Sequence, residues 1–264
     1  MRGTKLLKLT FIYSILSSSQ LFCQSARDVM EMSHNLKKPE STVVQLQMDL
    51  IDKNGHVEEA RKFTAWSRKK DGLSSMVLIF SNPASVKNTR YLQCEKKNAE
   101  NDKWIFIPAL KSTRRIAGAE GTKSFMGTDA TYDDISLRDI DDDIHEFVSE
   151  NEEKNGYTCW VVRSTPKDPK TSMYLCRVNW LDKKTHYPVF SEYYDKKGKV
   201  LKTLTMEKMT TMTGATGEVY DIPLQEYMKN LQTGHSTRII ASNIKLDTEI
   251  PERYFTQTFL TTGK

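Results

Sequence analysis

From Ser41 onward, apolar residues recur at every second position of the chain, which is the period of a β-strand whose two faces differ. In the first run the apolar residues are Val44, Leu46, Met48 and Leu50, and the turn-forming pair Asn54-Gly55 follows. Similar runs occur near 57–69, 73–81, 89–97, 103–108, 143–150, 155–164, 172–182, 187–196, 199–209, 217–231 and 235–245. About eleven antiparallel strands at this spacing predict a mainly β (α+β) protein built on one strongly curved sheet or barrel.

Several of these runs are apolar on both faces. Residues 76–80 and 104–107 contain no polar residue at all. A sheet with one face in water should instead alternate between apolar and polar side chains. We therefore expect each face of these strands to be covered, either by helices or by other apolar side chains that line a cavity.

Helical patterns flank the strands. Residues 27–37 form a short amphipathic pattern that predicts a helix before the first strand, and 251–255 predict a helical turn that begins with proline. The sequence contains no internal repeat and no linker long enough to separate two domains. Residues 26–264 are therefore expected to form a single domain.

The N-terminus has the pattern of a secretory signal peptide. Three basic residues within the first eight precede an apolar stretch over 9–22, and small residues follow at the −3 and −1 positions before Ala26. The apolar stretch is shorter than the roughly 20 residues that a membrane-spanning helix needs. We therefore expect residues 1–25 to be a signal peptide that is cleaved during export.

Cys23 offers an alternative to simple cleavage, because a cysteine at such a site can carry a lipid anchor. Phe22 argues against lipidation, since these sites prefer a small residue before the cysteine. A lipid-anchored form at Cys23 is therefore the secondary expectation.

The composition favours a soluble protein with one hydrophobic core, and it does not favour a nucleic-acid-binding protein. Hydrophobic residues make up 38% of the chain and the mean hydropathy is −0.57. Removal of residues 1–25 takes away three positive charges and no negative ones, so the formal net charge falls from +5 to +2. A nucleic-acid interface needs a concentrated basic face, and we expect no nucleic-acid partner.

Three cysteines follow the predicted signal. Cys159 and Cys176 lie on consecutive strand-like runs, and if they are opposed, residues 165–170 form the loop between them. A cross-strand disulfide between Cys159 and Cys176 would then be plausible in an oxidising compartment. Two buried free thiols are the alternative, and Cys94 stays unpaired in either case.

Sequence motifs for catalysis and metal binding are missing. The five histidines show no paired ligand spacing, and the chain has no nucleophile-elbow, phosphate-loop or dinucleotide motif. The acidic stretch 129–143 does not match a calcium loop, and we expect it to be solvated and to pair with Arg114 and Arg115. The sequence thus predicts no enzyme, no metal and no cofactor.

The segment 103–135 is the most distinctive part of the chain. An aromatic strand, a basic loop and a glycine-containing turn follow one another, which suggests a mobile flap over an apolar interior. Its motifs are Trp104, Phe106, and the runs PALK at 108–111, RRI at 114–116, FMGTD at 125–129 and YDD at 132–134. These motifs resemble the outer-membrane lipoprotein-sorting family of LolA-like periplasmic carriers, in particular the branch associated with RND-type exporters. The resemblance spans roughly residues 40–260.

The resemblance implies a fold and a function. The fold would be an incomplete, strongly curved antiparallel barrel, with helices and the flap closing a hydrophobic cavity for acyl chains. The protein would be a monomeric periplasmic carrier without catalytic activity, which moves a lipoprotein or lipid between the inner and outer membranes. An inner-membrane RND-type exporter and an outer-membrane acceptor would be its partners.

Nine residues are candidates for the cavity and the flap. They are Phe63, Met76, Leu78, Phe80, Phe106, Arg114, Arg115, Phe125 and Met126. The two arginines are expected to hold the flap or to meet a lipid head group. An alternative function is an accessory module that docks on an RND-type exporter and carries no cargo. A lipid-acting enzyme that uses Ser124 or Thr128 is a third.

Overall fold

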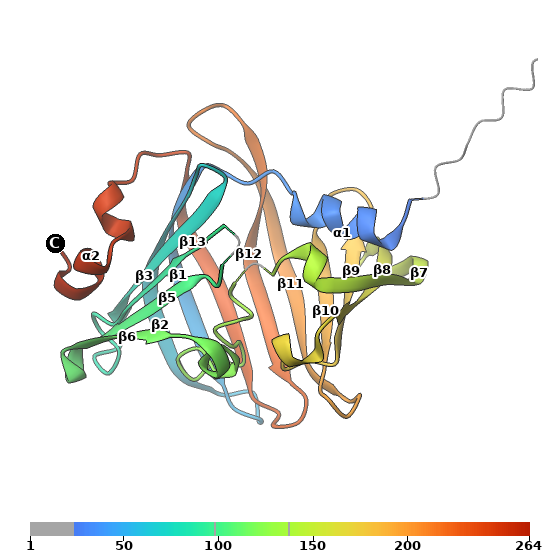
Figure 1. Ribbon diagram of the computed structural model, residues 1–264, viewed down its shortest axis with the longest axis horizontal. Helices are drawn as coiled ribbons and strands as arrows, with labels where there is room; N and C mark the ends of the chain where they lie inside the picture. Colours follow the sequence, from blue (N-terminus) through green and yellow to red (C-terminus); the bar gives the residue numbers. More distant parts are fainter. Residues whose placement is uncertain (1–23, 98, 137) are drawn as a thin grey trace, which may run out of the picture.

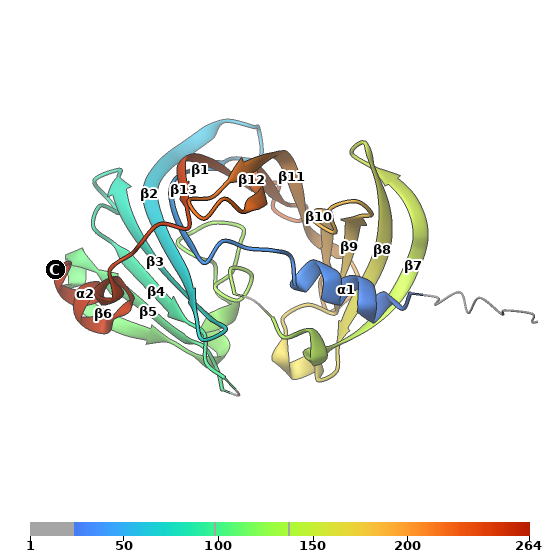
Figure 2. The same ribbon diagram turned by 90° about the horizontal axis from the view of Figure 1, so that it is seen from above.

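The computed structural model describes residues 24–97, 99–136 and 138–264, so Cys23 and nearly all of the predicted signal peptide lie outside the described residues. Thirteen strands form one antiparallel sheet, in the spatial order β6-β5-β4-β3-β2-β1-β13-β12-β11-β10-β9-β8-β7. Figure 2 shows that the sheet bends into an arch with one limb ending at β6 and the other at β7. The predicted mainly β architecture with an open, strongly curved sheet is confirmed.

Every strand except β6 falls on a predicted run. The strands are β1 (Ser41–Ile51), β2 (Val57–Lys70), β3 (Leu73–Asn82), β4 (Arg90–Cys94), β5 (Asp102–Ile107), β6 (Ser112–Ile116), β7 (Asp143–Lys154), β8 (Tyr157–Pro166), β9 (Cys176–Asp182), β10 (Pro188–Tyr194), β11 (Val200–Thr213), β12 (Val219–Asn230) and β13 (Ser236–Leu246). The helices are α1 (Ala26–His34) and α2 (Gln257–Thr262). Short 3-10 turns are η1 (Pro108–Leu110), η2 (Gly118–Thr122), η3 (Ile140–Asp142), η4 (Pro169–Thr171) and η5 (Glu252–Phe255).

The chain enters the sheet at its centre and returns there. Successive hairpins lead from β1 out to the edge strand β6, and a long connection then reaches the opposite edge strand, β7. Further hairpins lead back to β13, which pairs with β1. The long connection, residues 117–142, is called the crossing segment below, and it runs along the concave side of the arch (Figures 1 and 2).

Helix α1 lies on the inner side of the β7–β9 limb (Figure 2). Its first turn is closed by a capping box, in which the Ser25 hydroxyl accepts from the Asp28 backbone N–H at 3.1 Å and the Asp28 carboxylate accepts from the Ser25 N–H at 3.0 Å. Val29 on the helix is fully buried and packs with Val162 and Leu181 of the sheet.

The C-terminal segment covers the outer side of the other limb (Figure 2). Phe255, Phe259 and Leu260 of η5 and α2 pack with Val77 of β3 and Leu92 of β4. The neighbouring residues on the same strands point to the concave side and belong to a different hydrophobic cluster. The expectation that both faces of these strands are covered is therefore confirmed, by α2 on one side and by the crossing segment on the other.

Candidate functional site

An apolar groove lies at the centre of the sheet. Its volume is about 300 Å³, at the lower end of the range for small-molecule pockets. It is lined by Thr42, Val44, Leu46, Ile222, Pro223, Leu224, Gln225, Glu226, Ile239, Ala241 and Ile244. These residues come from β1, β12 and β13 and are all only partly buried. The groove therefore presents aliphatic surface that a ligand could cover.

The groove lies where β12 and β13 separate. These strands pair only between residues 225–229 and 236–240. Beyond this point β12 stays paired with β11 as far as Val219, whereas β13 stays paired with β1. The register of β11 also shifts near its contact with Pro223, which has no N–H to donate to a neighbouring strand. The sheet thus divides along a stretch that carries a bulge and a proline.

The far end of this division is closed by hydrogen bonds. The backbone N–H of Ala215 donates to the carbonyl of Leu246 at 3.1 Å. The Asp247 carboxylate accepts from the hydroxyls of Tyr220 and Thr216, each at 2.9 Å. The division is therefore a window bounded at both ends, not a frayed edge.

Glu226 is the ionisable residue in the lining of the groove. It lies opposite Met206 on β11 and Ile239 on β13, both apolar. Burial raises the pKa of Glu226, and within the described part of the chain neither a hydrogen bond nor a nearby charge contributes to the shift. The apolar surroundings therefore favour the neutral, protonated carboxyl.

The crossing segment is anchored to the sheet through a buried ion pair. The Asp134 carboxylate accepts from Lys202 Nζ at 2.6 Å, from the Thr131 N–H at 2.7 Å, and from the Tyr174 hydroxyl at 2.9 Å. The side chains of Asp134 and Lys202 are each only 3% exposed. Burial opposes ionisation of Asp134, but Lys202 and the hydrogen bonds hold its pKa below the ordinary value.

Two further aspartates of the crossing segment have partners on the sheet. Asp129 Oδ2 accepts from the Thr237 hydroxyl at 2.7 Å and lies 2.8 Å from Nδ1 of His235. Asp133 accepts from Lys103 Nζ at 2.7 Å. The prediction of a solvated acidic loop is therefore wrong for Asp129 and Asp134. The strands that supply their partners are distant in sequence, so the local pattern could not reveal them.

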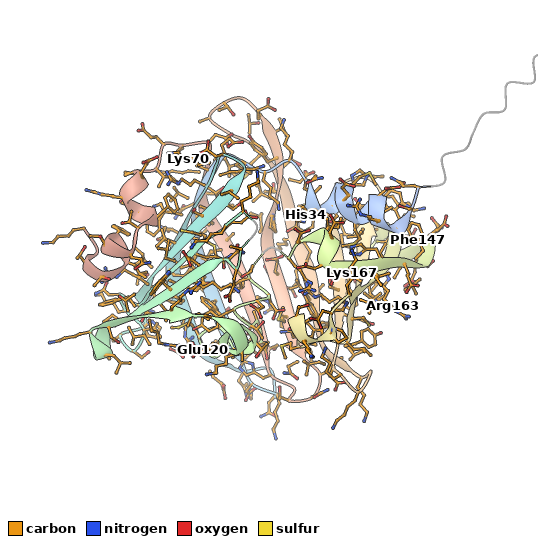
Figure 3. The ribbon with its side chains drawn as sticks, viewed as in Figure 1. His34, Lys70, Glu120, Phe147, Arg163 and Lys167 are labelled. Carbon is orange, nitrogen blue, oxygen red and sulfur yellow. The ribbon has the colours of Figure 1, made fainter. Side chains whose placement is uncertain are left out.

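The two predicted arginines lie on the edge strand β6. Arg114 pairs with Glu120 of the crossing segment at 2.9 Å, whereas Arg115 pairs with Asp102 of β5 at 3.1 Å. Their expected pairing with the 129–143 aspartates is therefore wrong. Arg114 nevertheless fastens the start of the crossing segment. Figure 3 shows Glu120 by the β6 limb and Lys167, whose N–H binds the other end of the segment, by the opposite limb.

Aromatic side chains of the crossing segment fill the concave side of the β1–β6 limb. Phe125 and Tyr132 lie 5.3 Å apart between ring centroids, and both contact Tyr91 of β4, at 5.4 and 5.8 Å. Phe125 is 3% exposed. This region is packed core, so the crossing segment occupies the space in which we expected an open cavity.

The predicted cavity residues fall into two groups. Phe63, Met76, Leu78, Phe80, Phe125 and Met126 share the concave cluster beneath the crossing segment. Phe106 lies on the outer face, in the cluster with α2, and the Arg90 guanidinium stacks 4.4 Å from its ring centroid. None of the nine predicted residues lines the groove. The groove nevertheless adjoins the first group, because Val44, Leu46 and Ile239 pack against that cluster.

Sequence reasoning missed Glu226, although a signal for it exists. In the run 222–228, isoleucine, leucine and methionine occupy alternate positions, and Glu226 takes the place where the next apolar residue belongs. A carboxyl on the apolar face of a strand is uncommon without a partner. That irregularity could have identified it.

The two cysteines on β8 and β9 do not face each other. Cys159 lies opposite Asp182, and Cys176 lies opposite Tyr194 on its other neighbour, β10. The ladder places Cys159 six residues from the position opposite Cys176, which is roughly 20 Å. Both thiols are free, so the predicted disulfide is wrong. The loop between the strands is longer than expected, because residues 167–175 connect them.

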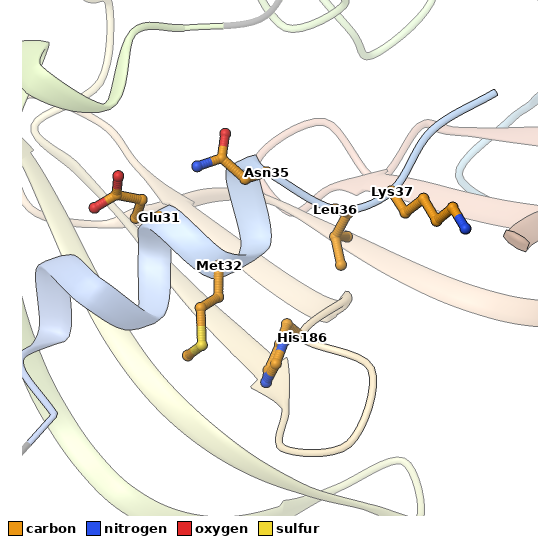
Figure 4. A pocket seen from close by; sticks show the side chains of 6 residues that line it. All are labelled: Glu31, Met32, Asn35, Leu36, Lys37 and His186. Atoms are coloured by element: carbon orange, nitrogen blue, oxygen red, sulfur yellow. The ribbon is translucent and has the colours of Figure 1, made fainter. Parts of the chain in front are cut away.

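A second hollow lies at the C-terminal end of α1. It has a volume of about 370 Å³ and is lined by Glu31, Met32, Asn35, Leu36, Lys37 and His186. Figure 4 shows Met32 and His186 on facing sides of it. The lining mixes polar and apolar groups, and His186 is stacked on Trp160. It offers less continuous apolar surface than the central groove.

Three further observations on the described residues concern possible nucleophiles, metal sites and membrane-spanning helices. The hydroxyls of Ser124 and Thr128 donate to the backbone carbonyls of Thr128 and Phe125, at 2.6 and 2.7 Å. Within residues 24–97, 99–136 and 138–264, no cluster of histidine, cysteine or acidic side chains has a metal-binding arrangement. In the same part of the chain, no helix combines the length and apolar character needed to cross a bilayer.

Comparison with known proteins places the chain in a family. A family model described only as an uncharacterized protein family matches residues 72–262. No curated protein matches the sequence. A solved structure of a DUF1329 family protein from Desulfovibrio piger is 26% identical, with a TM-score of 0.80, and the match covers 89% of this chain and 97% of that one.

Two further solved structures share the fold. A Vibrio parahaemolyticus domain named for outer membrane lipoprotein sorting is 28% identical with a TM-score of 0.80, and the match covers 90% of this chain and 98% of that one. A LolA superfamily protein from Nitrosomonas europaea is 20% identical with a TM-score of 0.66, covering 89% and 99%. The fold is thus similar to that of an outer-membrane lipoprotein-sorting domain and to that of a LolA superfamily protein, and the chain belongs to the uncharacterized protein family whose model spans residues 72–262.

Proposed function

We propose that this protein is a periplasmic carrier that binds acyl chains of a lipoprotein or lipid and moves them between the inner and outer membranes, without catalysing a reaction. The observation that supports this most directly is the partly exposed aliphatic groove at the centre of a LolA-like sheet. The predicted signal peptide at residues 1–25 supports the periplasmic location.

The size of the groove suits a carrier that must also release its cargo. Each methylene removed from water contributes about 0.8 kcal/mol, so a chain of ~16 carbons gains on the order of 12 kcal/mol when fully buried. A groove of about 300 Å³ covers only part of such a chain. Partial burial keeps the bound state close in free energy to the donor and acceptor membranes, which transfer requires.

We further propose that the concave cluster beneath the crossing segment extends this site. Phe63, Met76, Leu78 and Phe80 of the sheet would meet the cargo once the segment moves away, and Phe125 and Met126 would contact the cargo from the segment itself. Val44 and Leu46 connect the groove with this cluster, because they line the first and pack against the second. Arg114 would hold the closed position of the segment through Glu120.

The test is lipid binding by the exported protein and by variants with a filled groove. The periplasmic protein would be analysed by native mass spectrometry, by lipid extraction, and by titration with the apolar dye N-phenyl-1-naphthylamine. Ala241→Phe should fill the groove and abolish binding. Ser242→Phe is the matched control, because Ser242 is exposed and its neighbour Ala241 points the opposite way. A wild-type protein that neither carries lipid nor takes up the dye would refute the carrier.

A second function is supported by how fully the crossing segment fills one half of the concave side. A sheet with little free cavity suits an accessory module that docks on an RND-type exporter and holds no cargo. An apo mass for the wild type, together with co-purification of such an exporter, would favour this function. Loss of co-purification with Ala241→Phe as well as Ser242→Phe would then map docking to this part of the sheet.

A further inference from the structure

We propose that Glu226 recognises the linkage of the acyl cargo, by donating a hydrogen bond from its protonated carboxyl to the ester or amide carbonyl that joins an acyl chain to its head group. This inference rests on the proposed carrier function and adds a cargo class to it. The preferred cargo is an uncharged ester- or amide-linked acyl chain, in preference to a free fatty acid carboxylate or an ether-linked alkyl chain.

The position of Glu226 supports this role. It lies beside Gln225, whose pairing with Ile240 is the last rung before β12 and β13 separate. Glu226 and Gln225 therefore stand at the inner end of the window, and aliphatic side chains such as Ile222 and Ile244 continue along it. An acyl chain lying along the window would place next to Glu226 either its methyl end or the ester or amide group that joins it to the head group. Only the ester or amide group can form a hydrogen bond with the carboxyl.

Among the described residues, no positive charge contributes to the pKa of Glu226. Its strand neighbours Met206 and Ile239 carry no charge. Tyr187 and Tyr193 are titratable side chains that sense it: burial raises the pKa of each and Glu226 adds to the effect. At Tyr193 Asp134 also raises the pKa, and Arg177 lowers it. Both phenols therefore stay neutral throughout the ordinary pH range. Burial raises the pKa of Glu226, so its carboxyl stays protonated to higher pH than an exposed glutamate.

These conditions decide what the groove prefers. A neutral carboxyl can donate one hydrogen bond and needs an acceptor, which an ester or amide carbonyl supplies. A fatty acid carboxylate would bring a second acid into an apolar site without a balancing positive charge, which is unfavourable. An ether oxygen is a poorer acceptor, and a bare hydrocarbon leaves the carboxyl unsatisfied.

The experiment compares three ligands that share one chain length. Monopalmitin carries an ester, hexadecyl glyceryl ether lacks the carbonyl, and palmitate carries a carboxylate. Each displaces N-phenyl-1-naphthylamine from the wild type, from Glu226→Gln and from Glu226→Met. The glutamine variant keeps a hydrogen-bond donor of similar size, whereas the methionine variant keeps only the volume.

We expect the wild type at pH 6 to bind the ester about three- to tenfold more tightly than the ether, the ratio that one net hydrogen bond supplies. Glu226→Gln should keep this preference, and Glu226→Met should lose it while still binding the dye. The wild-type preference should decline as the pH rises toward 9, and that of Glu226→Gln should not. An ester preference that survives in Glu226→Met, or that shows no pH dependence in the wild type, would overturn the inference. Failure of the wild type to bind the dye would instead refute the carrier itself.

Discussion

Replacing Asp134 by asparagine should destabilise the protein more than any change to an exposed ion pair of the crossing segment. In the wild type this carboxylate satisfies Lys202, Thr131 and Tyr174 at once. Without it, the Lys202 ammonium keeps one carbonyl partner, Asp129 at 2.7 Å, and has no counter-charge. It cannot turn to water, because its side chain is 3% exposed.

The expected magnitude follows from this burial. Removal of one partner from a buried ion pair costs about 3–5 kcal/mol, because it leaves an uncompensated charge. That is a large fraction of the ~5–15 kcal/mol by which a domain of this kind is stable. Glu120→Gln is the matched control on the same segment. It removes the pair with Arg114, whose side chain is 44% exposed, and should cost about 1 kcal/mol or less.

The pair should also make stability depend on pH. The pKa of Asp134 is lower in the folded protein than its ordinary value of about 3.9. A depressed pKa contributes stability that is present above the unfolded-state pKa and is lost as the pH falls through the folded-state pKa. The difference between wild type and Asp134→Asn should therefore be constant above roughly pH 5 and should narrow in acid.

Urea unfolding followed by tryptophan fluorescence measures these free energies. Asp134→Leu and Lys202→Met, each alone and both combined, form a double-mutant cycle with the wild type. We expect the double variant to be more stable than either single variant, because an apolar pair leaves no buried charge. The reasoning is refuted if Asp134→Asn costs no more than Glu120→Gln, or if the double variant is the least stable of the set.

Three further predictions concern the concave core, the groove and the thiols. Phe125→Ala should lower the free energy of unfolding, measured by chemical denaturation, by about 3–5 kcal/mol, since the ring is buried among aromatic side chains. A decrease of less than about 1 kcal/mol would show that the crossing segment is not packed against the sheet at this position. The raised pKa of Glu226 means that its contribution to stability is present below about pH 4.3 and is lost as the pH rises through the folded-state pKa. Glu226→Gln should therefore gain stability relative to the wild type as the pH rises above about 4.3, and urea midpoints that stay parallel for the two proteins would contradict this. Burial raises the pKa of Cys159 to about 11 and also raises the pKa of Cys176. Both thiols should therefore react slowly with a thiol reagent in the folded protein, and fully in denaturant without reductant. If two thiols fail to react in denaturant, the two cysteines form a disulfide after all.

The arrangement of strands could be read from the sequence because it depends on local patterns. Period-two runs and turn residues lie within a few positions of each other, and twelve of the thirteen strands fall on the predicted runs, although about eleven strands were expected. β6 was not predicted, because its five residues, 112–116, include two arginines and only one apolar side chain. Its edge position explains this composition, since an edge strand beside solvent needs no apolar face.

The site was less predictable because it depends on long-range pairing. Asp134 pairs with Lys202 on β11, 68 residues away, whereas Arg114 and Arg115, the partners expected from the sequence, pair with Glu120 and Asp102. The expected opposition of Cys159 and Cys176 failed for a related reason, since the length of a loop sets the register of a hairpin. The separation of β12 from β13 depends on the pairing of these strands with their other neighbours, β11 and β1, so no single run shows it.

The path of the chain through the sheet has a consequence for how the protein can be made. β1 is synthesised early and β13 late, yet they form one central seam of nine paired positions. The crossing segment, which covers the inner face of the early half, is itself held by strands of the late half, because its Asp129 and Asp134 bind Thr237 and Lys202. A chain that crosses a membrane from its N-terminus first would thus expose the inner faces of β1 to β5 until its last third has emerged. Sealing of the arch is therefore a late, cooperative step, and a fragment ending before β11 should be unable to complete it.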